Sequence, residues 1–265
     1  MREQSSTLQE KFASLREENK KAFIVYVPFG FPTPQISEKV LLTLGETGVD
    51  IIEVGIPFSD PLADGPIIQN ASQVALQTGT TPLFLFEVLE RLKPAIKIPL
   101  VILTYYNSVY NLGIKRFLKY VKKCGVKGVM VVDLPIEEAK EYVTQARNME
   151  IDTIFFITPT TSKQRAKQIV KVSRGFIYYV SVTGITGPKN LFLSPIANYI
   201  KWLRGITELP ICVGFGIHKR SQVREVTTFC DGVILGSAVV KFIAENYTKD
   251  NFLPQLKNFL HQFIV

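Results

Sequence analysis

The sequence is short of cysteine, of histidine and of long apolar runs, and each shortage excludes a class of protein. Its 265 residues include three cysteines, Cys124, Cys212 and Cys230, an odd number at spacings too wide for a disulfide framework or a metal knuckle. A reducing, cytoplasmic compartment is therefore expected. The two histidines, His218 and His261, have no cysteine or histidine partner at metal-binding spacing, so a zinc site is not expected and no metal is predicted.

Membrane and nucleic-acid partners are also not expected. No apolar run approaches the ~20 residues that span a bilayer, and the polar, charged N-terminus has no apolar segment typical of a secretory signal. Lys and Arg number 31 against 23 Asp and Glu, a formal net charge of +8. The basic residues are scattered, without the basic tract and interleaved aromatic residues of a nucleic-acid interface. A solvated basic surface, or binding of an anionic metabolite, accounts for the excess.

Short runs of apolar and β-branched residues recur along the chain, separated by segments with helical periodicity. The runs are nearly continuously hydrophobic, as parallel strands covered on both faces require. Eight βα units in a chain of this length predict an α/β fold, a (β/α)8 TIM barrel. An open doubly wound sheet is the alternative, but no GxGxxG follows the first run. The eight runs begin at Ala22, Val49, Ile98, Val126, Ile151, Gly175, Leu209 and Cys230.

Two further helices are expected at the ends of the barrel. Thr7 and Glu10 match a capping box, and the apolar residues that follow them fall on one helix face. Such a segment is expected to close the bottom opening of the barrel. A second amphipathic pattern over residues 252–263 predicts a closing C-terminal helix. No linker or change of composition divides the chain, so residues 1–265 are expected to form a single domain.

The stretch EVGIPFSDPLADGP concentrates three carboxylates at the end of the second run. Glu53 falls at the C-terminal end of this strand, where a barrel places its reacting groups. An apolar barrel mouth would raise the pKa of Glu53 and suit it to proton transfer. The alternative is that Glu53 forms a structural ion pair. Asp64 and Asp60 follow on a loop bracketed by prolines. Either could instead cap a turn or a helix start, and for Asp60 that reading is favoured.

Glycine-rich turns follow the last three runs and suit a bound phosphate. GITGPKN follows the sixth run, GFG ends the seventh, and LGSAVV leads from the eighth into a helix. Glycine lets backbone N–H groups approach an anion closely, and the loops after strands seven and eight form the recurrent phosphate site of this fold. No run carries a lysine at its C-terminal end for imine chemistry. With metal and imine chemistry not expected, the sequence favours acid–base catalysis by carboxylates on a phosphorylated small molecule.

Several motifs together resemble one family. In order along almost the whole chain they are EVGIPFSDPLADGPIIQNA, TYYNSVYNLG, VVDLPIEEA, YYVSVTGITG, GFGI and DGVILGSAVVK. They look like the α subunit of tryptophan synthase. The resemblance implies a lyase that cleaves indole-3-glycerol phosphate to indole and glyceraldehyde 3-phosphate by a retro-aldol reaction. It also implies a β-subunit partner in an αββα assembly, and no cofactor on this chain, because pyridoxal phosphate belongs to the β subunit.

The same resemblance assigns roles to residues at matching positions. Glu53 becomes the general acid and base, and Asp64 the carboxylate that pairs with the indole N–H. The residues expected to hold the phosphate are Gly187, Gly216, Gly236 and Ser237. Those expected to line the indole pocket are Tyr26, Leu103, Tyr105 and Tyr178.

Two other functions stay open at this point. A regulatory barrel could activate a tryptophan synthase β subunit while its own cleavage step is weak or lost; the presence of Glu53 and Asp64 argues against this. Another phosphate-binding barrel, a sugar-phosphate isomerase or indole-glycerol-phosphate synthase, is opposed by the PFSDPLADGP loop. An assay of indole release, with and without a β subunit, separates the three.

Overall fold

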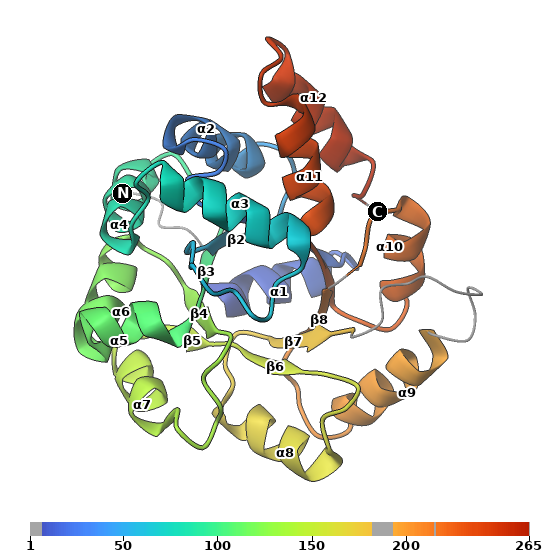
Figure 1. The fold of residues 1–265 in the computed structure, drawn as a ribbon. Coiled ribbons are helices and arrows are strands. Elements are labelled where there is room, and N and C mark those ends of the chain that lie inside the picture. Colours follow the sequence, from blue (N-terminus) through green and yellow to red (C-terminus); the bar gives the residue numbers. More distant parts are fainter. Residues whose placement is uncertain (1–6, 182–192, 215, 265) are drawn as a thin grey trace.

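Nine parallel strands form a nearly closed barrel inside a ring of helices (Figure 1). The computed structural model describes residues 7–181, 193–214 and 216–264. Neighbouring strands pair in the order β5-β4-β3-β2-β1-β9-β8-β7-β6. The strands are β1 (Ala22–Pro28), β2 (Ile51–Gly55), β3 (Leu100–Thr104), β4 (Gly128–Val131), β5 (Asp152–Thr153), β6 (Phe155–Ile157), β7 (Ile177–Val180), β8 (Ile211–Gly214) and β9 (Gly232–Leu235).

The predicted eight-run barrel is confirmed, with one run divided in two. The run that starts at Ile151 supplies both β5 and β6, which are separated by Ile154 alone. Its first half pairs with β4 and its second half with β7. Ile154 itself still donates a backbone hydrogen bond to Val129 O at 3.1 Å. The interruption therefore marks the point where the sheet closes on itself, which apolar patterning does not reveal.

The helices of the described residues follow the strands in the βα order that the sequence predicts. Residues 66–77 and 82–92 form two helices after β2, as the long interval between the second and third runs requires. The helices are α1 (Leu8–Glu17), α2 (Pro34–Gly45), α3 (Pro66–Gln77), α4 (Pro82–Leu92), α5 (Tyr106–Leu112), α6 (Ile114–Lys123), α7 (Lys140–Asn148), α8 (Lys163–Val172), α9 (Leu193–Arg204), α10 (Arg220–Val226), α11 (Ser237–Asn246) and α12 (Phe252–His261). None of them combines the length and apolar character needed to cross a membrane.

Local sequence signals explain where several helices start. In α2 and α4 a threonine precedes a proline at the first helical position, and proline there loses no helical hydrogen bond. The Thr33 and Thr81 hydroxyls accept hydrogen bonds from the backbone N–H groups three residues further on, at 3.3 and 3.2 Å. The α3 helix also begins with a proline, Pro66, but Gly65 before it provides no side-chain cap. The start of α3 sets the end of the loop that carries Asp64.

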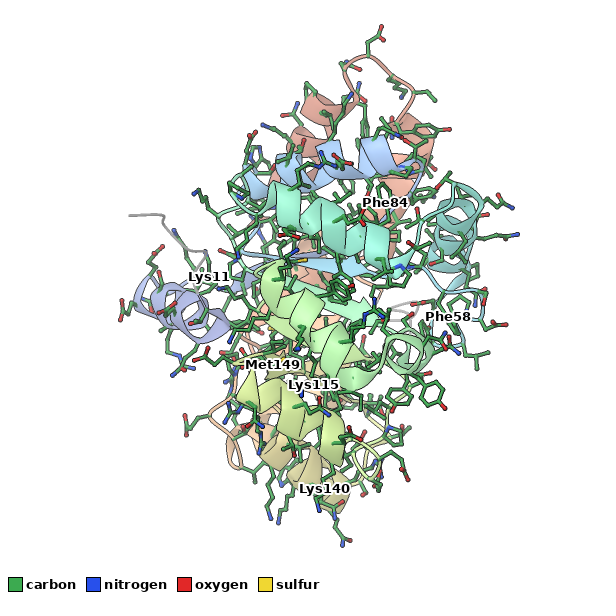
Figure 2. All side chains as sticks on the ribbon, turned by 90° about the vertical axis from the view of Figure 1, so that its left-hand side faces the viewer. Lys11, Phe58, Phe84, Lys115, Lys140 and Met149 are labelled. Carbon is green, nitrogen blue, oxygen red and sulfur yellow. The ribbon has the colours of Figure 1, made fainter. Side chains whose placement is uncertain are left out.

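The first helix closes the bottom of the barrel, as its capping box and apolar face predict. Thr7 and Glu10 form the reciprocal cap, with Glu10 N donating to Thr7 Oγ1 at 3.2 Å. Leu8, Phe12 and Leu15 are buried in one cluster with inward-facing residues of the strands. Lys11 of α1 and Phe58 lie at opposite ends of the molecule when it is viewed from the side (Figure 2). Among the described residues, α1 therefore covers the bottom of the barrel interior.

Candidate active site

A cavity of about 580 Å³ opens at the carboxyl ends of the strands. This is the end at which (β/α)8 barrels hold their reacting groups. The cavity is lined mainly by apolar side chains with two carboxylates among them. Its lining consists of Tyr26, Glu53, Ala63, Asp64, Gly65, Ile67, Ile68, Leu103, Val132, Phe156, Thr158, Tyr178, Val180, Gly216, Ile217, His218, Ile234, Gly236, Ser237, Ala238 and Lys241.

Most of the residues singled out from the sequence meet in this cavity. Tyr105 is not among the described residues that line it, and contacts Asp64 from behind instead. Gly187 lies outside the described residues. The predicted site residues brought together here are Tyr26, Glu53, Asp64, Leu103, Tyr178, Gly216, Gly236 and Ser237.

Strand alternation explains why these distant positions converge. Successive side chains of a strand point to opposite faces, so every second residue faces the barrel interior. On β2, Ile51 belongs to the buried interior cluster, and Glu53, two residues on, points the same way at a higher level. On β1 the same step leads from Ile24 to Tyr26, which is opposite Glu53 in the strand register. The apolar layer beneath thus fixes the positions of the polar groups above it.

Glu53 is buried in a way that favours its protonated form. The side chain is 0% exposed, and neither carboxylate oxygen has a hydrogen-bond partner among the described residues. Burial, and secondarily the negative charge of Asp64, raises the pKa of Glu53 to about 8. A structural ion pair, the alternative considered from the sequence, is absent from the described residues around it. Glu53 is therefore mostly a neutral acid at pH 7, able to donate a proton and then to take one back.

Asp64 is half-buried and is held by Tyr105, which directly follows β3. Tyr105 Oη donates a hydrogen bond to Asp64 Oδ2 at 3.0 Å and accepts one from Ala63 N at 3.1 Å. Burial raises the pKa of Asp64, while the bond from Tyr105 opposes that rise by favouring the charged form. Asp64 does not cap α3, whose first turn starts after Gly65. Its carboxylate is instead available at the cavity wall.

Replacing Tyr105 by phenylalanine should weaken catalysis through Asp64. A hydrogen bond to a charged group contributes about 1.5–3 kcal/mol, so the turnover rate should fall on the order of 10- to 100-fold. Loss of the bond should also raise the pKa of Asp64, moving the acidic limb of the pH–rate profile to higher pH. Steady-state kinetics across pH measure both effects. Tyr106→Phe is the matched control, and a profile that keeps its acidic limb in Tyr105→Phe would contradict the role.

Two tyrosines that line the cavity depend on glycines of the neighbouring strands. A Cβ atom at Gly55 of β2 would overlap the hydroxyl group of Tyr26, and one at Gly214 of β8 would overlap that of Tyr178. Each ring therefore leans across the neighbouring strand at a point where no side chain stands. Phe156 packs against Tyr178 with ring centroids 5.0 Å apart. The two rings are tilted by 46° to each other, and together with Tyr26 they form an aromatic wall that suits an apolar ring.

Another corner of the cavity offers backbone N–H groups. Helix α11 begins there at Ser237, after Gly236, and the first N–H groups of a helix have no acceptor within it. Gly216 contributes the opposite side of the corner and has a φ of +73°, a conformation that glycine adopts without strain. Since helix N-termini attract negative charge, this corner suits a phosphate group.

Sequence motifs alone missed 13 of the 21 described residues that line the cavity. Val132, Phe156 and Val180 could have been found by stepping two residues along each strand from the buried layer below. The α3 residues Ile67 and Ile68, and the two basic residues His218 and Lys241, had no such signal. Their positions depend on how α3, α11 and the loop before α10 return over the barrel mouth.

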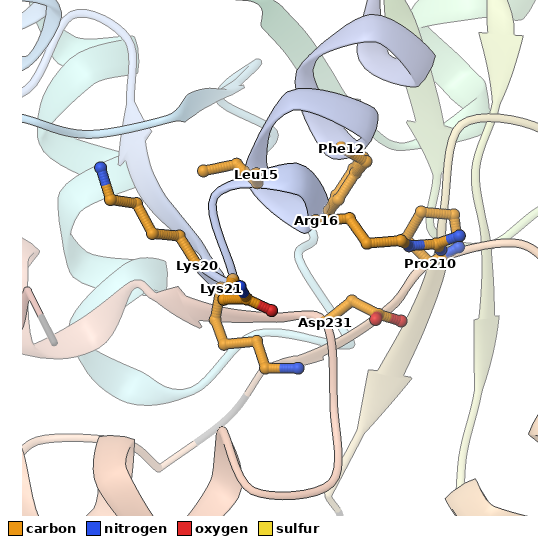
Figure 3. Close-up of a pocket in the computed structure, with 8 residues that line it drawn as sticks. Phe12, Leu15, Arg16, Lys20, Lys21, Pro210 and Asp231 are labelled. Carbon is orange, nitrogen blue, oxygen red and sulfur yellow. The ribbon is translucent and has the colours of Figure 1, made fainter.

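A smaller cavity, of about 220 Å³, lies at the opposite end of the barrel (Figure 3). Arg16, Lys20 and Lys21 surround it, next to Asp231. That carboxylate is already held by Arg204 Nη2 at 2.6 Å and by the N–H of Ile211 at 2.8 Å. The bottom cavity has no pair of free carboxylates among the described residues, whereas the cavity at the mouth has Glu53 and Asp64.

Apolar side chains are exposed on the loops beside the mouth. Leu62 is 93% exposed and Tyr110 is 71% exposed. Phe58 is half-buried and stacks on Tyr105, with ring centroids 5.1 Å apart. The place of Val109 in the segment 107–111, beside Tyr110, predicts an exposed side chain. This prediction is wrong, because α5 turns that face toward the barrel and Val109 is fully buried. Leu62 and Tyr110 remain as exposed apolar side chains on this side of the molecule.

Comparison with known proteins gives one consistent family. The family model described as tryptophan synthase alpha chain matches residues 12–263. A tryptophan synthase alpha chain from Petrotoga mobilis is 42% identical over 242 residues, covering 91% of this chain and 94% of that protein. One from Methanocaldococcus jannaschii is 42% identical over 253 residues, covering 95% and 90%.

Solved structures give the same result. The tryptophan synthase alpha subunit of Legionella pneumophila superimposes with a TM-score of 0.89 at 29% identity, covering 97% of this chain and 96% of that one. A ligand-free tryptophan synthase from M. tuberculosis gives a TM-score of 0.87 at 30% identity, covering 98% of each chain. The likeness therefore extends over the whole barrel.

Proposed function

This chain belongs to the tryptophan synthase alpha chain family, and on that premise we propose that Glu53 and Asp64 are its catalytic pair. The chain is a lyase that cleaves indole-3-glycerol phosphate to indole and glyceraldehyde 3-phosphate, the α reaction of tryptophan biosynthesis. The observation that carries the assignment is a fully buried, unpaired Glu53 in the same cavity as a second carboxylate. A barrel that only regulated a partner would have no need of such a costly buried group.

Glu53 can carry both proton transfers of the reaction. Its neutral carboxyl protonates the indole ring carbon that bears the glycerol phosphate chain, and the ring becomes cationic. The carboxylate left behind then takes the proton from the adjacent hydroxyl group, the carbon–carbon bond breaks, and the bond's electrons restore the aromatic ring. Glu53 ends protonated, so the cycle closes without another acid, metal or cofactor. A pKa of about 8 suits a group that must both donate and accept near neutral pH.

Asp64 stabilises the charge that forms between these two steps. The protonated indole ring is positive, and a fixed carboxylate beside its N–H is worth more in that state than in the neutral substrate. The bond from Tyr105 keeps Asp64 ionised and in place. The aromatic wall of Tyr26 and Tyr178, together with Leu103, receives the indole ring. Tyr105 acts as a positioning residue, behind Asp64.

The phosphate group occupies the corner formed by Gly216, Gly236 and Ser237. Helix N-terminal charge and free N–H groups support this placement. Gly187, in the motif GITGPKN, is also proposed to bind the phosphate. With the phosphate held there and the ring against the tyrosines, the bond to be broken lies near Glu53.

A side chain larger than alanine at Gly236 should disrupt this corner. An added Cβ would lie 3.4 Å from Tyr26 Cδ1, an ordinary contact, so Gly236→Ala should bind phosphate almost normally. The branched side chain of Gly236→Val has to displace Tyr26 or occupy the anion's space. Overpacking of this kind costs about 1–3 kcal/mol, so affinity for glycerol phosphate should fall roughly 10- to 100-fold. Calorimetric titration of both variants measures this, and equal affinities would contradict the placement.

A tryptophan synthase β subunit is the partner, in an αββα heterotetramer. The exposed Leu62 and Tyr110 beside the mouth form an apolar surface of the kind that signals an interface. Phe58 links that surface to Tyr105 and so to Asp64, which gives a docked partner a route to the catalytic site. The protein acts in the cytoplasm as a single domain of residues 1–265, in keeping with three free, buried cysteines.

Indole release from indole-3-glycerol phosphate is the deciding assay, run on the chain with and without a β subunit. Cleavage by the isolated chain that accelerates when the β subunit is added supports both the reaction and the partner. No indole under either condition would overturn the assignment of the cavity. Amide hydrogen exchange with and without the β subunit tests the docking face. On binding, protection should rise in residues 57–64 and 107–111. A rise confined to the opposite end of the barrel would contradict the proposed face.

A further inference from the structure

The hydroxyl group of Tyr26 is a polar group of the cavity that the proposed reaction leaves without a role. Tyr26 lines the cavity, and among residues 7–181, 193–214 and 216–264 its hydroxyl has no hydrogen-bond partner. A buried phenol usually has a polar partner, so a ligand is expected to supply it. Burial first, and then the charges of Asp64 and Glu53, raise the pKa of Tyr26 well above its ordinary value. The hydroxyl therefore keeps its proton and acts as a hydrogen-bond donor.

The strands place this hydroxyl one level above Glu53. Tyr26 and Glu53 are directly opposite in the register of β1 and β2, and both line the cavity. The next inward-facing position on β2 is Gly55, where an added Cβ atom would overlap Tyr26 Oη. The phenol thus fills the space of a missing side chain on the mouth side of Glu53. It is close to the space in which a substrate reacts with Glu53.

The same ring connects the catalytic strand with the phosphate corner. Gly236 directly follows β9, the other neighbour of β1, and a Cβ atom there would lie 3.4 Å from Tyr26 Cδ1 and 3.6 Å from Tyr26 Cβ. Tyr26 therefore extends from the phosphate corner to the level above Glu53. A substrate with its phosphate at that corner and its reacting bond at Glu53 has its linking chain along this ring. In indole-3-glycerol phosphate that chain carries two hydroxyl groups, and the one beside the indole ring loses its proton in the reaction.

We infer that Tyr26 is a specificity-determining residue whose hydroxyl donates a hydrogen bond to the substrate hydroxyl beside the indole ring. The inference rests on the proposed function and adds a contact that selects the hydroxylated chain. While Glu53 removes the proton of that substrate hydroxyl, its oxygen carries growing negative charge until the carbon–carbon bond breaks and the carbonyl group forms. A hydrogen bond to a charged oxygen is stronger than one to a neutral oxygen. The contact therefore contributes to affinity and more to turnover, and Tyr26 keeps its own proton throughout.

Binding of two related ligands, measured by calorimetry, tests this contact. Indole-3-glycerol phosphate carries both hydroxyl groups, and 3-(indol-3-yl)propyl phosphate carries neither. Both are titrated into the full chain with Glu53→Gln, which should not cleave the first ligand, and into the same chain with Tyr26→Phe added. Tyr26→Phe should weaken binding of the hydroxylated ligand roughly 3- to 10-fold and leave binding of the propyl ligand within about twofold. An equal loss for both ligands would indicate a packing role and overturn the inference.

Tyr179→Phe is the matched control. Tyr179 neighbours Tyr178 on β7 but faces outward, with its ring 5.7 Å from that of Tyr199 and with a buried hydroxyl that has no partner in the described part of the chain. Removing this hydroxyl makes the same chemical change away from the cavity, so neither dissociation constant should change. A loss in Tyr179→Phe equal to that in Tyr26→Phe would also overturn the contact.

Kinetics with indole-3-glycerol phosphate separate the contact from the reaction itself. In the chain that keeps Glu53, Tyr26→Phe should lower kcat on the order of tenfold, because the lost bond strengthens as charge develops on the substrate oxygen. A kcat within about twofold of the wild type would contradict the inferred bond to the reacting hydroxyl. Indole release with no Tyr26-dependent preference between the two ligands would reject the contact and keep the proposed reaction. Such a preference without indole release would keep the contact and reject the reaction.

Discussion

Replacing Glu53 by glutamine should nearly abolish indole release and at the same time make the protein harder to unfold. Glutamine has the shape of the protonated acid but cannot transfer a proton. General acid–base groups contribute about 10²–10⁴-fold, and a residue that handles both protons belongs at the upper end of that range. Binding of glycerol 3-phosphate should be nearly unchanged, because the phosphate is held by backbone N–H groups of the glycine corner and not by Glu53. Rapid assays of indole formation, with calorimetric titration of glycerol 3-phosphate, measure the two quantities.

The stability effect follows from the raised pKa of Glu53. Its pKa is about 8 in the folded protein against 4.5 as the ordinary value, so the unfolded chain loses this proton first as the pH rises. Stability is therefore full below pH 4.5, falls as the pH rises toward 8, and levels off above that pH. At pH 7 the raised pKa of Glu53 lowers the free energy of unfolding by an amount on the order of 3 kcal/mol, relative to its value below pH 4.5. Glu53→Gln should remove this decline, which thermal unfolding at pH 5 and pH 8 measures directly.

Activity should depend on the same ionisation. For the free enzyme, kcat/KM should fall as the pH rises through about 8, where Glu53 loses the proton that it donates to the indole ring. Residual activity of Glu53→Gln should lack that alkaline limb. A variant with activity within a few-fold of the wild type, or one destabilised at pH 8, would remove Glu53 from its role.

The position and burial of Glu53 could be predicted because both depend on a regular feature of the chain. Side chains alternate along a strand, which fixes the residues of β2 that face inward, and the end of the apolar run fixes the level at which they stand. Burial among apolar neighbours then sets the direction of the pKa shift. Tyr26 and Tyr178 are assigned by the family resemblance, and the N-terminal helix that closes the bottom follows from its capping box and its apolar face. In each case the information lies within a short segment.

The position of Tyr105 could not be predicted in the same way. It was expected to line the indole pocket, yet its hydroxyl group binds Asp64, which is 41 residues away in the chain. That contact depends on how the loop before α3 folds back over β3, and the prolines in that loop indicate rigidity without indicating direction. The division of β5 from β6 is similar, since the closure of a barrel is a property of the whole sheet. Contacts between loops thus set the details of the site.

Replacing Asp64 by asparagine should lower the turnover rate strongly and leave substrate affinity nearly unchanged. Asparagine retains an oxygen that can accept the hydrogen bond from Tyr105, so the loop should keep its conformation while the charge is lost. That charge acts on the cationic ring formed after protonation, where a preorganised group of this kind contributes about 3–4 kcal/mol. We therefore expect kcat to fall about 10²- to 10³-fold, as measured by steady-state kinetics. Asp60→Asn, a neighbouring exposed carboxylate, is the control in the isolated chain.

A second consequence separates this role from simple substrate binding. The negative charge of Asp64 is one of the two causes that raise the pKa of Glu53, after burial. Asp64→Asn should therefore lower the pKa of Glu53, and the alkaline limb of the kcat/KM profile should move to lower pH. Burial persists in the variant, so the limb should remain well above the ordinary range for a carboxylic acid. If only KM changed and the alkaline limb stayed in place, Asp64 would be a substrate-binding group without an electrostatic effect on Glu53.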